Sequence, residues 1–381
     1  MPGNRNTPQA HAAFQRDAAG RFAISGTVAS IRPYGAGHIH ATYRVRTKER
    51  SNPGYILQRV NTAIFTDVPR LMENIARVTE HMRRQVEDPR REVLTVVPSH
   101  DGRPYHQDDD GNYWRCFLFI EHKELGERPH DLKQAFEAGR LYGRFVSLLS
   151  DLPGPPLHEI IPRFHDVEFR LTEFAGALRA DPLKRRQGAE REIAFVLARA
   201  EDMKRVLVAG REGRIRRRIT HNDTKFNNVL FDDSGRGLCL IDLDTVMSGY
   251  AHYDFGDAVR SAANQATEDE ADPGRVRVDL DVFRELARGF IQALKGGLDD
   301  AEIGLLAFAA KLLPYTIGLR FLGDHMSGDV YFKTAKPGHN LQRARAQFAL
   351  LADMERHFSE MEDIISRLAA GQPRPDAEKG G

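Results

Sequence analysis

The stretch that decides the fold spans residues 219–246 and reads ITHNDTKFNNVLFDDSGRGLCLIDLDTV. Two short apolar runs, at 229–231 and 238–243, flank the turn-forming sequence Asp-Asp-Ser-Gly, and this pattern predicts a strand, a turn and a second strand. Asp223 and Asn228 precede the first strand, and Asp242 ends the second. Such a hairpin brings these three side chains to one end of the strand pair.

These residue types are the ones that transfer of a phosphoryl group requires. Its transition state spreads negative charge, so the protein must provide Mg²⁺, a carboxylate that accepts the proton of the attacking hydroxyl, and donors for the phosphoryl oxygens. Mg²⁺ takes oxygen ligands, which Asn228 and Asp242 can provide, with Asp244 as a further candidate. Asp223 is the candidate base. The alternative is an ordinary acidic hairpin in which Asp and Asn serve only the turn.

The stretch resembles the catalytic and metal-binding loops of the aminoglycoside phosphotransferase/choline kinase superfamily. More narrowly, ITHNDTKFNNVLF, LIDLDTVMSG and YDFGDAVR are similar to the N-acetylhexosamine 1-kinases, and the similarity extends from about residue 28 to about residue 365. Those enzymes phosphorylate the anomeric hydroxyl of N-acetylglucosamine or N-acetylgalactosamine. The resemblance implies ATP and Mg²⁺ as cofactors and a sugar as the acceptor.

The fold class that the resemblance implies is α/β (α+β), a protein-kinase-like fold of two lobes. Residues 22–121 are the expected small, β-rich, nucleotide-binding lobe, with strands at 28–33, 41–47 and 55–60 and a helix at 70–85. Residues 122–370 are the expected helical lobe, which carries the catalytic hairpin and the acceptor site; its helices include 189–208 and 303–322. Residues 1–21 and 371–381 lack periodicity and are predicted to be mobile tails.

A glycine-containing turn follows the first predicted strand. Its glycines allow backbone N–H groups to approach phosphates, so Gly35, Gly37 and His38 are candidate contacts of ATP. Kinases of this fold usually carry a lysine on the third strand, but this chain has Gln58 there. Gln58 can donate a hydrogen bond to the nucleotide without adding charge. Glu73, which would orient that lysine, has a solvated helix face as its alternative.

The resemblance also assigns the adenine and acceptor contacts. The adenine segment, at the end of the strand that leads to the hinge, consists of Phe119, Ile120, Glu121 and His122. Near the base, Lys225 faces the γ-phosphate and Thr224 belongs to the substrate site. Arg320 and Tyr331 correspond to sugar-binding positions. Alternatively, Arg320 pairs with Asp324, four residues further along a helix. Asp254 is expected to brace the catalytic loop, and Asp257 to lie near a helix N-terminus.

Composition restricts the partners. The formal net charge of +1 gives no reason to expect a nucleic-acid or membrane partner. The sequence shows neither an apolar signal core nor a run of membrane-spanning length, so we expect a cytoplasmic protein. Cys116 and Cys239 lie in apolar runs and are expected to be buried free thiols. The oligomeric state and the choice of ATP over GTP stay open.

Two rival functions agree with the same motifs. A kinase for choline, an aminoglycoside or another amino alcohol would need acidic or aromatic groups for a cationic acceptor. An arginine in the acceptor segment and a single tryptophan on the hinge strand argue against this rival. A pseudokinase that only binds nucleotide is supported by the missing lysine. The intact set of Asp223, Asn228 and Asp242 argues against it.

Overall fold

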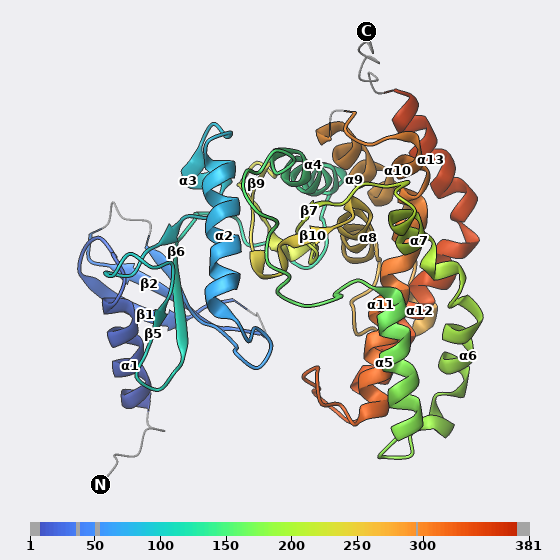
Figure 1. Cartoon of the computed structure of the whole chain (residues 1–381), viewed down its shortest axis with the longest axis horizontal. Helices are drawn as coiled ribbons and strands as arrows, with labels where there is room; N and C mark the ends of the chain where they lie inside the picture. Colours follow the sequence, from blue (N-terminus) through green and yellow to red (C-terminus); the bar gives the residue numbers. More distant parts are fainter. Residues whose placement is uncertain (1–7, 36–38, 50–53, 295, 372–381) are drawn as a thin grey trace. The chain divides into compact units, whose positions relative to one another are not determined.

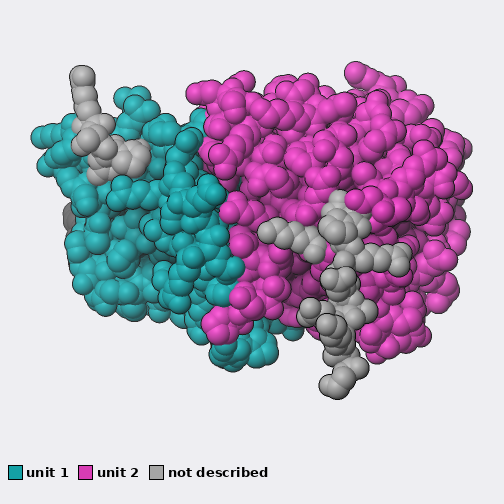
Figure 2. Space-filling view, turned by 90° about the horizontal axis from the view of Figure 1, so that it is seen from above, with its two compact units in different colours: residues 1–122, 154–161, 239–244 teal, residues 123–153, 162–238, 245–381 magenta. Residues whose placement is uncertain are grey.

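The structure, a computed structural model, describes residues 8–35, 39–49, 54–294 and 296–371. The chain forms two compact units, which Figure 2 shows in different colours. The first unit contains residues 1–122, 154–161 and 239–244, and the second contains residues 123–153, 162–238 and 245–381. The first is therefore the predicted N-terminal region with two short segments added from later in the chain. One of these segments carries Asp242 and Asp244.

A six-stranded antiparallel sheet organises the first unit. Its strands are β1 (Val28–Pro33), β2 (Ala41–Thr47), β3 (Tyr55–Arg59), β4 (Val96–Val97), β5 (His106–Gln107) and β6 (Tyr113–Leu118). They follow the order β1-β2-β3-β6-β4, and β5 also pairs with β6. In this register Gln58 of β3 lies directly opposite Arg115 of β6. The three strands expected from the sequence are confirmed.

The two faces of this sheet pack against different helices (Figure 1). Alternate residues point to opposite faces, so Leu57 and Trp114 belong to one core, which also contains residues of α1 (Pro8–Gly20). On the other face, Nη1 of Arg115 lies 4.0 Å from the sulfur of Met72 in α2 (Val68–Arg83). The unit also contains the short helix α3 (Pro89–Glu92). The sheet thus has an apolar face and a face that carries Gln58 and Arg115.

The predicted mobile tail over residues 1–21 was wrong for residues 8–20, which form α1. Ala18 and Ala19 are buried, and the ring of Phe14 lies 5.4 Å from that of Trp114. This helix has no strong apolar stripe of its own. It is stabilised by a partner about a hundred residues away, which local periodicity does not reveal.

The second unit is mainly helical. Its helices are α4 (Leu132–Leu148), α5 (Val167–Ala180), α6 (Glu190–Arg199), α7 (Arg205–Arg211), α8 (Ala251–Ala262), α9 (Leu280–Ala293), α10 (Asp300–Gly304), α11 (Leu306–Ser327), α12 (His339–Arg356) and α13 (Phe358–Ala370). The helix expected at 189–208 was wrong as a single element: the chain breaks between α6 and α7, where Met203 is fully buried. The helix expected at 303–322 is divided between α10 and α11, and α11 continues to Ser327.

Two short ladders carry the hairpin and the loop before it. Strand β7 (Arg218–Thr220) pairs with β10 (Met247–Gly249), so that Thr220 lies opposite Met247. Strand β8 (Val229–Phe231) pairs with β9 (Gly237–Leu240), which confirms the predicted hairpin. Residues 221–228 connect β7 to β8, so the predicted catalytic residues lie on a loop whose two ends are fixed in sheets.

Helices α4 and α9 cross at very close range because glycines occupy the contact. A Cβ atom added to Gly139 would lie 2.0 Å from the carbonyl oxygen of Leu286, and one added to Gly289 would lie 2.1 Å from that of Phe136. No side chain fits at such distances unless the backbone moves. This contact anchors α4, whose Tyr142 hydroxyl donates to the carbonyl of Lys225 at 2.8 Å in the catalytic loop.

Helix α11 passes a length and composition test for a membrane span, contrary to the sequence prediction. It has 22 residues and a mean hydropathy of 1.2, and 83% of the tested window is buried. Its burial by other parts of the second unit explains its apolar composition, so this is weak evidence for a membrane span. Cys116 and Cys239 are both free and buried, as predicted, and burial raises the pKa of each thiol.

Candidate active site

The loop that carries Asp223 is held in place by hydrogen bonds to Asp254, which lies in the first turn of α8. The Asp254 carboxylate accepts the backbone N–H of His221 at 2.8 Å and that of Asn222 at 2.7 Å. Its own carbonyl accepts the hydroxyl of Thr224 at 2.6 Å. The prediction that Asp254 braces the catalytic loop is confirmed. Thr224, which was expected to contact substrate, is buried and points into this support.

Asn222 holds the loop in a backbone conformation that few residues tolerate. Its φ is 65°, in the left-handed region, which asparagine accepts more readily than most non-glycine residues. Its amide donates to the carbonyl of Thr245 at 2.9 Å, and its carbonyl accepts Nε2–H of His165 at 2.9 Å. Burial lowers the pKa of His165 to about 4, which keeps this imidazole neutral near pH 7. The loop is therefore held from three directions.

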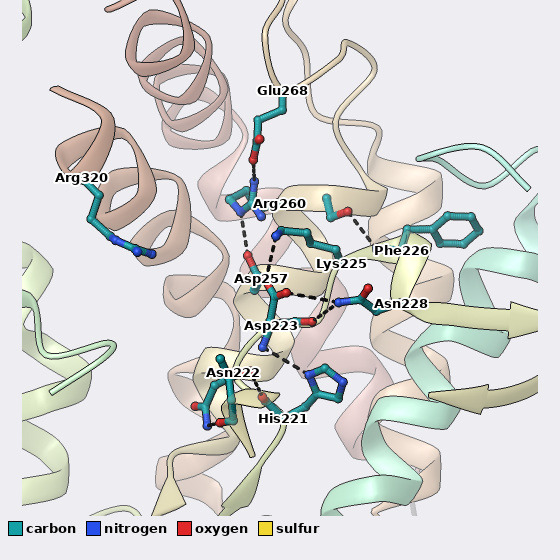
Figure 3. A network of polar contacts seen from close by, with 12 residues as sticks. His221, Asn222, Asp223, Lys225, Phe226, Asn228, Asp257, Arg260, Glu268 and Arg320 are labelled. Atoms are coloured by element: carbon teal, nitrogen blue, oxygen red, sulfur yellow. Dashed lines mark hydrogen bonds and ion pairs between the residues drawn. The ribbon is translucent and has the colours of Figure 1, made fainter. Parts of the chain in front are cut away.

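Asp223, Lys225 and Asn228, the three residues proposed as the catalytic set, lie close together (Figure 3). Nζ of Lys225 lies 3.0 Å from Oδ1 of Asp223. The amide nitrogen of Asn228 donates to the carbonyl of Asp223 at 2.8 Å and lies 3.3 Å from its Oδ2. The amide oxygen of Asn228 consequently faces away from Asp223, as Figure 3 shows.

Positively charged side chains near Asp223 keep its carboxylate ionised. Burial acts to raise the pKa of Asp223, but Lys225, His221 and Arg260 outweigh it and hold this pKa below its usual range. Asp223 in turn raises the pKa of Lys225. At neutral pH the site therefore contains a carboxylate that can accept a proton, next to a permanent ammonium.

A buried chain of charges lies beside this pair. Arg260 of α8 donates to Asp257 at 2.7 Å and to Glu268 at 3.0 Å (Figure 3). Asp257 was expected near a helix N-terminus, but it lies in the middle of α8, where its partner Arg260 is three residues further along the same face. Both acids contribute to the raised pKa of Lys225. Sequence reasoning missed Arg260 and Glu268, although the i, i+3 spacing of Asp257 and Arg260 was visible.

The first unit contains the two aspartates that follow β9. Asp242 has a φ of 61°, a left-handed conformation that suits the end of a strand before a tight turn. Ligand atoms of His40, Asp242 and Asp244 lie within 4.8 Å of one another, as in a metal site. However, both oxygens of Asp244 accept from Arg115, and one also contacts Nε2 of His40. Asp244 thus forms a buried ion pair, which does not favour the predicted role of metal helper.

The predicted nucleotide contacts of the first unit are only partly described. Gly35 has a φ of 75°, which only glycine adopts easily, whereas Gly37 and His38 lie outside the described residues. Gln58 donates to Thr42 at 3.0 Å and accepts Nε–H of Arg115 at 2.9 Å, so both ends of its amide are engaged. Its predicted contact with the nucleotide stays a prediction.

The predicted adenine segment follows β6. Ile120 and Phe119 are buried, and the guanidinium of Arg44 lies over the Phe119 ring while contacting Glu121 at 3.2 Å. Nε2 of His122 lies 3.3 Å from the hydroxyl of Tyr34, in the turn after β1. The segment is therefore packed against the turn that contains Gly35, within the same unit.

Glu73 does not orient a residue of β3. Its carboxylate is exposed and lies 2.9 Å from Nε2 of His158, which is partly exposed. The solvated helix face, the alternative drawn from the sequence, is what the structure contains.

The acceptor segment is built around Asp324. Its carboxylate accepts the backbone N–H groups of residues 330, 331 and 332 at 2.8–2.9 Å and the amide of Asn340 at 2.9 Å. Asp324 therefore does not pair with Arg320, and that alternative was wrong. Arg320 instead donates to the hydroxyl of Tyr331 at 3.5 Å. The two predicted sugar contacts thus lie together.

Arg320 lies among aromatic rings rather than among acids. Its guanidinium is 5.2 Å from the Phe164 ring, 5.6 Å from that of Tyr331 and 5.4 Å from that of Phe332. Within the described part of the chain it forms no ion pair with a carboxylate. Burial and the nearby Arg170 lower the pKa of Arg320, whereas the negative charge of Asp223 acts to raise it. In Figure 3 its side chain extends from α11 toward the side of the loop where Asp223 lies.

Comparison with known proteins assigns this arrangement to a family. The model of the phosphotransferase enzyme family matches residues 30–289, well over half of the chain. The chain belongs to this family. Membership of a phosphotransferase family agrees with what the hairpin motif had indicated.

Several solved structures have similar folds. They include a microcompartment-associated aminopropanol kinase (18% identity, 92% of this chain and 98% of that chain, TM-score 0.55). A choline kinase from Cryptosporidium parvum Iowa II is similar over 90% of this chain and 92% of that chain (13% identity, TM-score 0.59). An amicoumacin kinase solved with AMP-PNP and Ca²⁺ matches over 92% and 93% (12% identity, TM-score 0.55). At these identities the likeness shows the kinase-like two-lobe fold, with a β-sheet N-terminal region and a helical C-terminal region.

Proposed function

We propose that this kinase transfers the γ-phosphoryl group of ATP to the anomeric hydroxyl of an N-acetylhexosamine. The observation that carries the proposal is the placement of Arg320. This arginine lies beside the hydroxyl of Tyr331, is surrounded by three rings, and has no carboxylate partner among the described residues. Such a guanidinium offers forked donors to hydroxyl and amide oxygens of an uncharged ligand.

A cationic acceptor fits this environment less well. A protonated amine is attracted by carboxylates or by aromatic rings that no other cation occupies. Here Arg320 already lies near the rings, and Arg170, which is paired with Glu173 at 2.6 Å, is a second cation nearby. An N-acetylated sugar carries hydroxyls and an amide but no charge, so it meets no repulsion at these positions. The positive charge in the acceptor segment therefore supports an uncharged acceptor over a cationic one.

Within this proposal each residue of the loop has one task. Asp223, kept ionised by Lys225, accepts the proton of the attacking hydroxyl, and Lys225 offsets the negative charge that develops on the phosphoryl oxygens. The oxygen donors Asn228 and Asp242 suit a hard divalent cation, which we propose to be Mg²⁺. When bound, that cation neutralises charge on the nucleotide phosphates. The fixed loop conformation supplies the positioning on which this reaction depends.

The proposal is tested by steady-state kinetics of Arg320→Ala with N-acetylglucosamine and N-acetylgalactosamine. We expect the sugar KM to rise, or kcat/KM for the sugar to fall by about tenfold or more, while the ATP KM stays nearly unchanged. The matched control is Arg199→Ala. Arg199 also lies over a ring, 3.6 Å from the Phe195 centroid, but it pairs with Glu355 at 2.8 Å. An Arg320→Ala enzyme that loses only ATP affinity would contradict the assignment of the acceptor segment.

A further inference from the structure

The first unit contains a buried polar cluster around Arg115. Its side chain is 3% exposed, as is that of Asp244, to which it donates from both Nη atoms. Its Nε–H donates to Oε1 of Gln58 at 2.9 Å. Three elements meet here: β3, β6 and the turn after β9. Burying an ion pair costs desolvation free energy, which is offset only where the charged atoms have hydrogen-bond partners. Arg115 and Asp244 have such partners here.

His40 completes the cluster, and its hydrogen bonds define its protonation. The backbone N–H of Asn61 donates to Nδ1 of His40 at 3.0 Å, so Nδ1 must carry a lone pair. Nε2 then carries the proton and donates to Asp244. Neither nitrogen of His40 is available to a metal in this arrangement. Both Asp244 oxygens are also engaged, so the cluster is a support and not a cation site.

The support acts on Asp242, which the proposed function makes a metal ligand. Asp244 is two residues beyond Asp242, in the turn Leu243–Thr245. Asp242 itself has a left-handed φ of 61°, which costs free energy and persists only where neighbouring contacts hold the backbone in place. The bonds from Arg115 and His40 to Asp244 are such contacts.

We propose that Arg115 is a positioning residue for the metal–nucleotide site. Through Asp244 it fixes the turn that carries Asp242, and from β6 it places beside Gln58 the positive charge that the third strand lacks. The register of the sheet allows β6 to supply this charge in place of β3, because Gln58 and Arg115 lie directly opposite each other. The inference rests on the proposed use of ATP and a divalent cation, but not on the identity of the acceptor.

The test measures binding of Mg²⁺·AMP-PNP by isothermal titration calorimetry without any acceptor. Arg115→Met should weaken binding by about tenfold or more, because a charged partner of the turn is lost. It should also raise the Mg²⁺ concentration needed for half-maximal turnover more than it raises the acceptor KM. Arg115→Lys keeps the charge but not both contacts with Asp244. Its affinity for Mg²⁺·AMP-PNP should lie between those of Arg115→Met and the wild type.

A second-site variant separates positioning from general destabilisation. In Gln58→Lys/Arg115→Met, a lysine on β3 places an ammonium beside Asp244, and we expect it to restore part of the lost affinity. If Arg115→Met does not fold, Arg115→Met/Asp244→Leu removes the whole pair, since apolar replacement of a buried pair is often tolerated. That variant should fold and still bind Mg²⁺·AMP-PNP about tenfold or more weakly.

Arg83→Met is the matched control for lost stability. Arg83 lies in the same unit and donates to the carbonyl of Pro89 at 2.8 Å and to the hydroxyl of Thr95 at 2.6 Å. It should lower the melting temperature without changing the nucleotide Kd. Wild-type affinity in Arg115→Met or in the double variant without the pair would overturn the proposal. An equal loss of nucleotide affinity in Arg83→Met would also overturn the proposal. Absence of turnover with every sugar would leave these binding results unaffected and would count only against the proposed acceptor.

Discussion

Nζ of Lys225 lies 3.0 Å from Oδ1 of Asp223, two residues before it in the same loop. The pair combines a carboxylate that stays ionised with an ammonium that stays protonated, because each stabilises the charge of the other. Such a pair can accept a proton from a hydroxyl and at the same time stabilise charge on a phosphoryl group. The proposed chemistry depends on this relationship.

Asp223→Asn should abolish turnover while leaving the fold and nucleotide binding nearly intact. The amide keeps the shape of the side chain and can still accept from Asn228, but it cannot take up the proton of the acceptor. General-base assistance contributes about 10²–10⁴-fold to a rate. Initial rates of ADP release, with Kd for AMP-PNP as the control, check this. A variant that keeps more than about a tenth of wild-type turnover would rule out Asp223 as the base.

Lys225→Met should lower kcat more than it raises the KM for ATP. The ammonium stabilises charge that appears only as the phosphoryl group is transferred, and loss of one such donor typically costs about 10²–10³-fold in kcat. Lys225→Arg keeps the charge and should recover part of the rate. Equal defects in both variants would mean that Lys225 serves only the shape of the loop.

The pH dependence of turnover should follow Asp254 and not Asp223. Burial raises the pKa of Asp254 to about 6, above the ordinary value of 3.8, whereas the pKa of Asp223 is lowered. As the pH falls through about 6, protonation of Asp254 weakens its bonds to the loop and kcat/KM should decline. A profile of kcat/KM that stays flat down to about pH 5 would contradict this assignment.

The raised pKa of Asp254 affects the stability of the fold in the opposite direction to its effect on turnover. Because the folded-state pKa of Asp254 lies above the unfolded value, this group makes the fold less stable as the pH rises from about 4 to about 6. Acidification through that window therefore does not unfold the protein through Asp254. Thermal melts recorded beside the kinetic profile should show activity declining while the fold is intact.

Asp242→Ala should weaken the binding of Mg²⁺ and nucleotide more severely than Asn228→Ala. The aspartate brings a full charge to a divalent cation, whereas the amide oxygen brings only a dipole. Titration of Mg²⁺ against ATP turnover for both variants compares them directly. Unchanged Mg²⁺ dependence in Asp242→Ala would place the metal elsewhere. Asp244 is an unfavourable substitute, since Arg115 already occupies both of its oxygens.

Gly139→Ala should destabilise the second unit by roughly 1–3 kcal/mol, the usual cost of overpacking a tight contact. The new methyl group would lie 2.0 Å from the carbonyl of Leu286, so α4 and α9 must separate. Gly188→Ala is the matched control, because nothing lies within 4 Å of a Cβ added there. Chemical denaturation of both variants measures the difference, and equal stabilities would show that the helices do not cross as described.

The parts of the fold and site that the sequence predicted are those encoded locally. The catalytic hairpin and the three strands of the first unit follow from apolar spacing and turn residues. Proximity of Asp223, Lys225 and Asn228 is likewise a local property, since all lie within six residues.

The parts that the sequence did not predict depend on partners distant in the chain. Arg115 and Asp244 are separated by 129 positions, and no local pattern relates them. The assignment of Arg320 to Asp324 failed because that carboxylate instead satisfies the backbone of the following turn. Helix α1 was missed since the ring of Trp114, rather than its own sequence, provides its packing surface. In each case a long-range contact overrides the preference that nearby residues express.

A product analysis identifies the acceptor. Purified protein is incubated with ATP, Mg²⁺ and either N-acetylglucosamine, N-acetylgalactosamine, choline or kanamycin, and the products are identified by ³¹P NMR. We expect a sugar phosphate whose phosphorus couples to the anomeric proton, formed from an N-acetylhexosamine at a rate well above that of either cationic acceptor. Phosphorylation of choline or kanamycin, with no anomeric phosphate from either sugar, would show that the acceptor is not an N-acetylhexosamine.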